Sequence, residues 1–200
     1  MRSNTDIKPR IKEVARMLFF TKGYNSVTTD ELAYELGTSK RTIYEHFKSK
    51  EEILDEVVSD MRQQMDTEFE SLINRDVPFG QMMNDVFALT GKVSGYFKPS
   101  LLEDIRRYAP PVFVKINAIR MDSVQKKIKQ MFEKGTQEGI FRSDISSDFL
   151  VFVFGAVFER MSTSDIFNTM PITTTDAQGM FARLMFEGLY SKDFRSKMNI

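Results

Sequence analysis

The chain has 200 residues and no cysteine, and its 28 Lys and Arg balance 28 Asp and Glu. The absence of cysteine excludes disulfides and thiolate chemistry, and a single histidine, His46, excludes clusters of His and Cys ligands for a metal. The composition, 42% hydrophobic and 28% charged, is ordinary for a globular protein of one or two domains. No basic-then-apolar signal pattern opens the sequence, and its longest nearly apolar run, 149–158, is too short to span a bilayer as a helix. We therefore expect a cytoplasmic protein.

The charge is unevenly distributed along the chain. Residues 1–50 hold ten Lys and Arg against six Asp and Glu, a net +4, whereas residues 51–200 hold eighteen against twenty-two, a net −4. A basic N-terminal module on an acidic body suits a DNA-binding head. Sampling variation also accounts for an excess of four charges, so the asymmetry supports this interpretation only beside other signals.

The first predicted helix covers about residues 6–22. Its apolar residues recur at helical spacing and form one stripe. Gly23 is expected to end it. The stripe consists of Ile7, Ile11, Val14, Ala15, Leu18 and Phe19.

Residues 28–50, TTDELAYELGTSKRTIYEHFKSK, predict two short helices joined by a tight turn, with a third helix beginning behind them. Thr28 and Glu31 have the spacing of a capping box, which Ser49 and Glu52 repeat at the start of the third helix, and Gly37 follows the last apolar residue of the first helix. Thr38 or Ser39 can cap the second helix, which runs from 40 to about 47. This order is that of a helix-turn-helix, whose second helix enters the major groove of DNA.

The second helix carries side chains that suit DNA recognition. Lys40, Arg41 and Thr42 lie in its first turn, where a recognition helix meets base edges, and Arg or Lys can pair with guanine O6 and N7. Ile43 and Phe47 are four residues apart and should pack inward. The polar and basic groups expected to hold phosphates are Tyr44, His46, Lys48 and Lys50.

With FFTKGY at residues 19–24 and TTDELAYELGTSKRTIYEHFKSKEEIL at residues 28–54, the first quarter of the chain resembles the DNA-binding domain of the tetracycline-repressor (TetR) family of bacterial transcription regulators. The resemblance implies an all-α, TetR-like fold. A three-helix helix-turn-helix head would occupy residues 1–50, with its motif at about 28–47. A C-terminal bundle of about six helices, residues 51–200, would bind a ligand and dimerise.

The function that the resemblance implies is that of a homodimeric repressor, released from a palindromic operator by a small-molecule ligand. Its partners would be double-stranded DNA, a second copy of itself and an unknown small apolar or amphipathic ligand, with no cofactor, no metal and no membrane. We expect no enzymatic activity, because no convergent acid, base or nucleophile stands out. The alternative is an architectural or protein-interaction protein that has a TetR-like head but no specific operator.

The resemblance also assigns DNA contacts residue by residue. Lys40 and Arg41 are expected to set specificity, since these positions vary within the family. Glu45 departs from the pattern, and two interpretations stay open: it accepts from cytosine N4, or it faces away from the phosphates. The predicted DNA-binding residues are Thr28, Thr29, Lys40, Arg41, Thr42, Tyr44, His46 and Lys50.

The remainder of the sequence predicts further helices and no persistent strand. A long helix is expected over about 50–74, one weakened by glycines over 81–97, and a short one over 99–109. After the Pro110–Pro111 pair a long helix runs to about 134 or beyond, and 135–146 is predicted to be a turn region containing glycine. The last two helices are expected over 147–161 and 174–190.

The middle helices, where the resembled family holds its ligand, are rich in aromatic residues, and the chain contains 13 Met and 18 Phe. Such residues line adaptable apolar sites. Apolar residues at helical spacing are also simply core, so the pocket prediction rests on the resemblance. The predicted pocket residues are Phe87, Tyr96, Phe97, Leu101, Tyr108, Phe113, Asn117 and Met121.

The last two predicted helices match the pair that forms a four-helix dimer interface in the resembled family. The first of them contains FLVFVFGAVF, residues 149–158, which is apolar nearly all round and so calls for burial on every side. An ordinary buried core helix is the alternative. The predicted interface residues are Phe152, Gly155, Ala156, Phe181, Leu184 and Met185.

Overall fold

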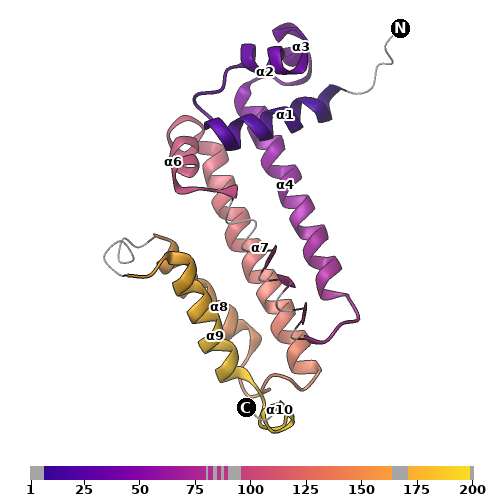
Figure 1. Cartoon of the computed structure of the whole chain (residues 1–200), viewed down its shortest axis with the longest axis vertical. Helices are drawn as coiled ribbons and strands as arrows, with labels where there is room; N and C mark the ends of the chain where they lie inside the picture. Colours follow the sequence, from indigo (N-terminus) through magenta and orange to yellow (C-terminus); the bar gives the residue numbers. More distant parts are fainter. Residues whose placement is uncertain are drawn as a thin grey trace. The chain divides into compact units, whose positions relative to one another are not determined.

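The computed structural model describes residues 7–79, 81–82, 85–86, 88–89, 96–163 and 171–198, and within these residues the fold is all-α (Figure 1). The one contact of strand type in this part of the chain is an isolated antiparallel bridge between Phe141 and Tyr190. No helix among the described residues is both long and apolar enough to cross a membrane. The helices are α1 Ile7–Lys22, α2 Thr29–Leu36, α3 Lys40–His46, α4 Lys50–Ile73, α6 Pro99–Tyr108, α7 Pro110–Gln137, α8 Ser147–Thr163, α9 Thr174–Leu189 and α10 Lys192–Met198.

Contacts divide the chain into two compact units, Met1–Arg120 and Met121–Ile200. The predicted division at residue 50 is a functional one and stays a prediction. Most of the helix predicted over 81–97 lies outside the described residues, although those at 81–82, 85–86, 88–89 and 96 are helical.

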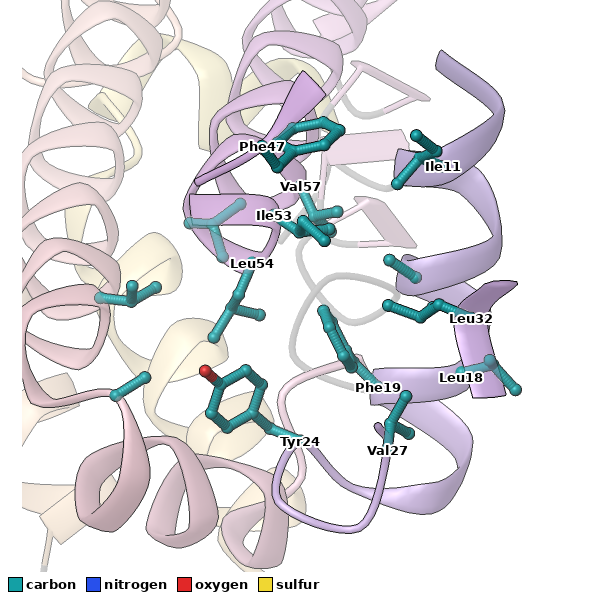
Figure 2. Close-up of a cluster of buried hydrophobic side chains, with 14 of the residues drawn as sticks. Ile11, Leu18, Phe19, Tyr24, Val27, Leu32, Phe47, Ile53, Leu54 and Val57 are labelled. Atoms are coloured by element: carbon teal, nitrogen blue, oxygen red, sulfur yellow. The ribbon is translucent and has the colours of Figure 1, made fainter. Parts of the chain in front are cut away.

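The first unit is built around one continuous apolar core (Figure 2). The stripe of α1 packs against α2 and α4, and α2 packs against α3, so α1, α2 and α3 gather at the N-terminal end of α4 (Figure 1). The same core continues into α6 and the first turns of α7 through Leu101, Ile105, Ala109, Val112 and Ile116. The helix-turn-helix therefore shares its core with the segment that follows it in the chain.

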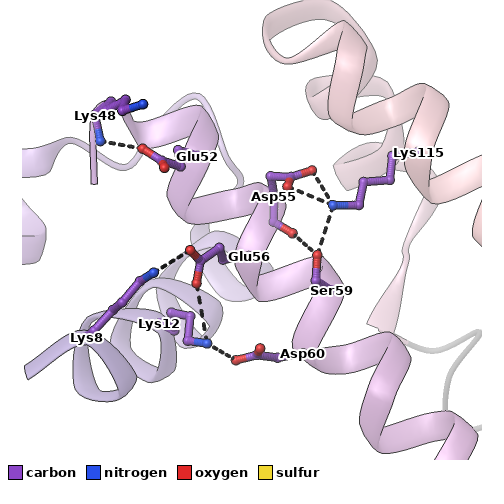
Figure 3. A network of polar contacts seen from close by, with 9 residues as sticks. All are labelled: Lys8, Lys12, Lys48, Glu52, Asp55, Glu56, Ser59, Asp60 and Lys115. Carbon is purple, nitrogen blue, oxygen red and sulfur yellow. Dashed lines mark hydrogen bonds and ion pairs between the residues drawn. The ribbon is translucent and has the colours of Figure 1, made fainter. Parts of the chain in front are cut away.

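Ion pairs border the contact between α1 and α4 (Figure 3). The Lys8 ammonium lies 2.6 Å from Glu56 Oε1, and the Lys12 ammonium lies 2.6 Å from Asp60 Oδ2 and 3.6 Å from Glu56 Oε2. All four side chains keep part of their surface in water, so each pair contributes at most about 1 kcal/mol. Apolar burial supplies most of the stability here, and the charges favour one register of α1 along α4.

A second polar contact joins α4 to α7 (Figure 3). The Lys115 ammonium lies 2.7 Å from both carboxylate oxygens of Asp55 and 2.9 Å from the Ser59 hydroxyl. The Ser59 hydroxyl donates in turn to the Asp55 backbone carbonyl at 2.8 Å. This cluster fixes the rotation of α4 about its own axis relative to α7. The helix-turn-helix lies at the N-terminal end of α4.

Local capping defines the helix-turn-helix as the sequence predicts. Thr28, Ser39 and Ser49 each accept a backbone N–H three residues on, at 3.0 to 3.1 Å. Gly37 ends α2 in the left-handed region, with φ of 63°. The second hydrogen bond of each expected capping box, from the cap N–H to the glutamate, is not formed. The Glu31 carboxylate instead accepts from Lys22 of α1, and the Glu52 carboxylate accepts from the backbone N–H of Lys48.

The second unit contains α8 and α9 lying side by side (Figure 1). The rings of Phe154 and Phe181 join the two helices with centroids 5.2 Å apart. The long helix predicted to about residue 134 or beyond is α7, which continues through Gly135 to Gln137 and turns at Gly139, whose φ is 72°. A single glycine inside a helix costs only about 1 kcal/mol, which the neighbouring hydrogen bonds outweigh.

The terminal helix α10 has no counterpart among the sequence predictions. Its seven residues are too few to register as a periodic pattern. It is held by the Phe194 ring against Tyr190, at 5.1 Å between centroids, and by the Ser191 hydroxyl, which accepts from the Phe194 N–H at 3.1 Å.

The turn between α2 and α3 gives the first prediction. Gly37→Ala should lower the free energy of unfolding by about 1 kcal/mol, because φ of 63° is unfavourable for any residue with a Cβ. Gly179→Ala is the matched control. It lies inside α9 with open space around the added methyl group, and should raise stability by about 0.5–1 kcal/mol. Urea unfolding followed by circular dichroism measures both, and an equal effect of the two substitutions would contradict the assigned turn geometry.

Candidate nucleic-acid interface

The short helix α3 is held by one face and exposes the other. Ile43 and Phe47 are buried in the core, as predicted. Arg41, Tyr44 and Glu45 occupy the opposite side and are exposed, with 89% of the Arg41 side chain accessible to solvent. Residues three and four apart share a helix face, so these three side chains form one outward surface. We refer to this surface of Arg41, Tyr44 and Glu45 as the reading face.

The two cations in the first turn of α3 each have a carboxylate partner. The Lys40 ammonium lies 2.8 Å from Asp30 Oδ2 of α2, and this hydrogen bond raises the pKa of Lys40. The Arg41 Nε donates to Glu45 Oε1 at 3.1 Å, within α3. The pair to Asp30 ties the two helices of the motif together, whereas the pair to Glu45 lies wholly on the reading face.

The predicted hydroxyl and imidazole contacts lie around the same helix. Thr29 is nearly buried, and its hydroxyl lies 3.5 Å from the Tyr44 hydroxyl. The Thr42 hydroxyl lies 2.9 Å from that of Ser39. His46 Nδ1 is 2.9 Å from the Thr42 carbonyl oxygen, which can only accept, so Nδ1 carries the proton of this hydrogen bond. The backbone thus fixes the ring, and Nε2 points away from this bond.

Lys50 has a structural role that sequence reasoning missed. Its ammonium donates to the carbonyls of Tyr24 and Val27, at 3.0 and 2.9 Å, and lies 4.3 Å from the centroid of the Tyr24 ring. Burial lowers the pKa of Lys50, and burial raises the pKa of Tyr24 to about 12. The lysine closes the loop between α1 and α2, and its contact with a DNA phosphate stays a prediction.

A carboxylate of α6 holds the same loop from the other side. Asp104 accepts from the Asn25 N–H at 2.8 Å, and a Cβ on Gly23, whose φ is 91°, would lie 3.3 Å from the Asp104 carboxylate. Asp104 is 79 residues away in sequence from Asn25 and carries no local motif. No pattern in a single sequence identifies such a contact.

The predicted pocket residues are distributed over several environments. Leu101 is buried in the core shared with the head, and Phe97 and Phe113 pack against that core. The rings of Tyr96 and Phe97 both meet Phe20 of α1, with centroids 6.5 and 5.4 Å away.

The remaining predicted pocket residues do not pack together in the described structure. Tyr108 is exposed beside the guanidinium of Arg107, and Asn117 is half-buried. Phe87 and the side chain of Met121 lie outside the described residues. A hollow on the described surface lies elsewhere, between the C-terminal half of α4 and Asp85, Ala88 and Leu89, and none of the predicted pocket residues that the structure describes lines it. The ligand site stays a prediction.

The predicted interface residues separate into exposed and packed groups. Phe152 and Leu184 are exposed, at 69% and 70%, and Ala156 is exposed one turn beyond Phe152. Gly155 is buried, 3.7 Å from Gln125 measured from an added Cβ. The Phe181 ring packs on α8 within the same chain, and Met185 is half-buried.

Comparison with known proteins agrees with this geometry. Residues 11–57 match the model of the bacterial regulatory proteins of the tetR family, a segment that includes most of α1, all of α2 and α3, and the first turns of α4. The matched segment and the helix-turn-helix together define a DNA-binding transcriptional regulator. Residues 11–57 therefore form a DNA-binding head of the TetR-family type.

Relatives extend the similarity beyond the head. The transcriptional repressor KstR2 of Mycolicibacterium smegmatis is 25% identical over 160 residues, which cover 74% of this chain and 73% of KstR2. A transcriptional regulator of Cytophaga hutchinsonii superposes with a TM-score of 0.76 at 14% identity, covering 93% of this chain and all of that one. A regulator of Saccharomonospora viridis, solved with choline, gives a TM-score of 0.70 at 18% identity over 94% and 100% of the two chains. The two solved structures show that the described helices follow the fold of these regulators.

The contacts of Lys50 give the second prediction. Lys50→Ala should lower the free energy of unfolding without DNA by about 1–3 kcal/mol, because two loop carbonyls lose a charged donor. Lys48→Ala is the control, since Lys48 is exposed two residues earlier, and it should change stability by less than about 0.5 kcal/mol. Urea unfolding of both variants decides this, and equal stabilities would remove the structural role of Lys50.

Tyr24 gives a prediction on pH. Its pKa is raised to about 12, so the proton is bound more tightly in the folded chain than in the unfolded chain. The associated stability is complete below pH of about 10 and is lost as pH rises from about 10 towards 12. Urea unfolding between pH 8 and 11.5 should show a steeper loss for the wild type than for Tyr24→Phe. Parallel curves would contradict the burial assigned to this phenol.

Proposed function

We propose that this TetR-family regulator is a cytoplasmic homodimeric repressor that a small-molecule ligand releases from a palindromic operator. The observation that carries the proposal is the reading face, which α3 presents on a head matching the family model. Arg41 projects into solvent from the first turn of α3, while Ile43 and Phe47 anchor the opposite side in the core. A helix anchored on one side and polar on the other can enter a major groove without disturbing its own packing.

Within this proposal the first turn of α3 meets base edges and the surrounding groups meet phosphates. Lys40, Arg41 and Thr42 read the bases, and Tyr44 and His46 contact the backbone. Thr28 and Thr29 open α2 and approach the backbone from the other side of the turn. Lys50 completes the phosphate contacts. The carbonyls of Tyr24 and Val27 hold the Lys50 ammonium half-buried beside the loop between α1 and α2. Lys50 therefore attracts a DNA phosphate from this position.

The proposed dimer uses the exposed apolar surface of α8 and α9. Phe149, Phe152, Met180 and Leu184 are all exposed on these two helices. Large apolar side chains gathered on one surface of a folded protein mark an interaction site. Covering this surface with the same surface of a second chain gives a two-fold dimer, which in turn predicts a palindromic operator.

The proposed ligand is a small apolar or amphipathic molecule bound among the middle helices. Its support is the likeness to KstR2, a repressor, and to the regulator solved with choline. Phe97, Leu101 and Phe113 belong to a core that also contains α1, so a molecule inserted there would strain the packing of the head. Such a ligand would shift the population away from the DNA-binding arrangement.

Selection of bound duplexes from a random pool, followed by sequencing, tests the proposed function. We expect a palindromic consensus with half-site centres about 34–36 Å apart, or a multiple of that distance. Enrichment of no sequence by a folded, helical protein would contradict specific operator binding and favour the protein-interaction alternative. Loss of binding to the consensus duplex on addition of candidate amphipathic molecules then identifies the ligand.

The dimer surface gives its own prediction. Leu184→Arg places a charge on the exposed face of α9 and should shift the protein to monomers, with at least tenfold weaker binding to a palindromic duplex because two heads no longer bind together. Val114→Arg is the matched control, since Val114 is 67% exposed on α7, and it should leave both properties unchanged. Sedimentation velocity measures the first property and fluorescence anisotropy the second. A Leu184→Arg variant that stays dimeric would exclude this face.

A further inference from the structure

Glu45 is the one residue of the reading face for which the sequence left two interpretations open, and in the structure it forms an ion pair with Arg41. The Arg41 Nε donates to Glu45 Oε1 at 3.1 Å, and both side chains are exposed, at 89% and 54%. The two residues lie one turn apart on the outward side of α3. We propose that Glu45 is a positioning residue: it holds the guanidinium of Arg41 so that its two terminal nitrogens face one guanine of each half-site. This inference rests on the proposed function.

The geometry of the guanidinium supports this assignment. An arginine has five N–H donors in a rigid planar fork. The bond to Glu45 occupies Nε on the inner edge of the fork and leaves the two terminal nitrogens, Nη1 and Nη2, available at its outer edge. Two parallel donors match the O6 and N7 acceptors that guanine presents in the major groove, and no other base presents this pair of acceptors.

The positions of the two residues along α3 argue against Glu45 as a reader of cytosine. Arg41 is the second residue of α3 and Glu45 the sixth, so Arg41 is nearer the end of the helix that meets base edges. A carboxylate that left Arg41 to accept from cytosine would abandon a cation and approach the phosphates as an unpaired anion. Held at Arg41, the same carboxylate keeps its charge compensated.

The neighbouring pair of Lys40 and Asp30 provides an internal comparison. Its ammonium and carboxylate are 2.8 Å apart, but the pair joins α3 to α2 and its cation is a point charge without a planar fork. Removing Asp30 acts on Lys40 alone, so it should change general attraction to DNA without changing the preference at the base pair that Arg41 reads. Removing Glu45 should change discrimination at one base pair. The contrast separates an orienting carboxylate from one that only balances charge.

The experiment measures competition for the full-length wild type and its variants between the consensus duplex and duplexes with each position replaced symmetrically by the other three base pairs. The variants are Arg41→Ala, Glu45→Ala, Glu45→Gln, the double variant Arg41→Ala with Glu45→Ala, and the control Asp30→Asn. All these side chains are exposed, so circular dichroism and urea unfolding should show each variant folded.

We expect the Arg41 and Glu45 substitutions to weaken the base preference at the same base pair. Arg41→Ala should reduce the preference for guanine at one symmetric position about tenfold to 100-fold. Glu45→Ala should reduce the preference at the same position about twofold to fivefold, and Glu45→Gln by less, while binding to random DNA does not weaken. In the double variant, loss of Glu45 should add nothing to the loss of Arg41. Asp30→Asn should leave the preference at this position unchanged.

Two results would overturn the assignment of Glu45. Relaxation by Glu45→Ala at a different base pair from Arg41→Ala, with effects that multiply in the double variant, would make Glu45 a separate reader of cytosine. Unchanged base preferences in Glu45→Ala would mean that the ion pair between Arg41 and Glu45 exists only in the free protein and has no part in recognising DNA. In both cases the wild type still selects its palindrome, whereas a wild type that selects no sequence contradicts the proposed function itself.

Discussion

The geometry of the helix-turn-helix depends on the burial of two side chains, Ile43 of α3 and Phe47 directly after it. A helix of seven residues has too few internal hydrogen bonds to persist alone in water, so tertiary packing must hold it. Ile43 and Phe47 supply that packing by entering the core of α1, α2 and α4. Because they lie on one side of α3, their burial also determines which residues face outward. The position of Arg41 and Glu45 in solvent is therefore a consequence of the core and not of any interaction that they make themselves.

The polar contacts refine what apolar burial establishes. Around α4, lysines of α1 and α7 meet a row of carboxylates, and their partial exposure limits what each pair contributes to stability. Lys50 and Asp104 act differently, since they satisfy backbone groups of the loop between α1 and α2. Through Asp104, α6 holds the loop that leads into the helix-turn-helix. The helix-turn-helix head is therefore held to α6 by a backbone hydrogen bond as well as by the apolar core that they share.

The sequence predicted the parts of this structure that local chemistry determines. The caps at Thr28, Ser39 and Ser49, the turn at Gly37 and the inward face of α3 follow from residues within a few positions of one another. It did not predict the short α10 or the carbonyl contacts of Lys50, because each depends on packing or on partners distant in sequence. The family pattern supplied the expectation that Lys50 meets phosphate, and it held no signal for the role of Lys50 in the free protein. The ligand pocket could not be predicted from the sequence pattern either. A buried residue such as Leu101 has the same helical spacing whether it fills a core or lines a cavity.

The proposed function requires that two copies of α3 read major grooves on the same side of one operator. Hydroxyl-radical footprinting of the wild type on its selected consensus duplex tests this directly. We expect protected segments on one face of the duplex, related by two-fold symmetry, with centres about one helical turn of 34–36 Å apart or a multiple of it. A single protected segment, or protection spread evenly over the duplex, would contradict paired reading by the two heads.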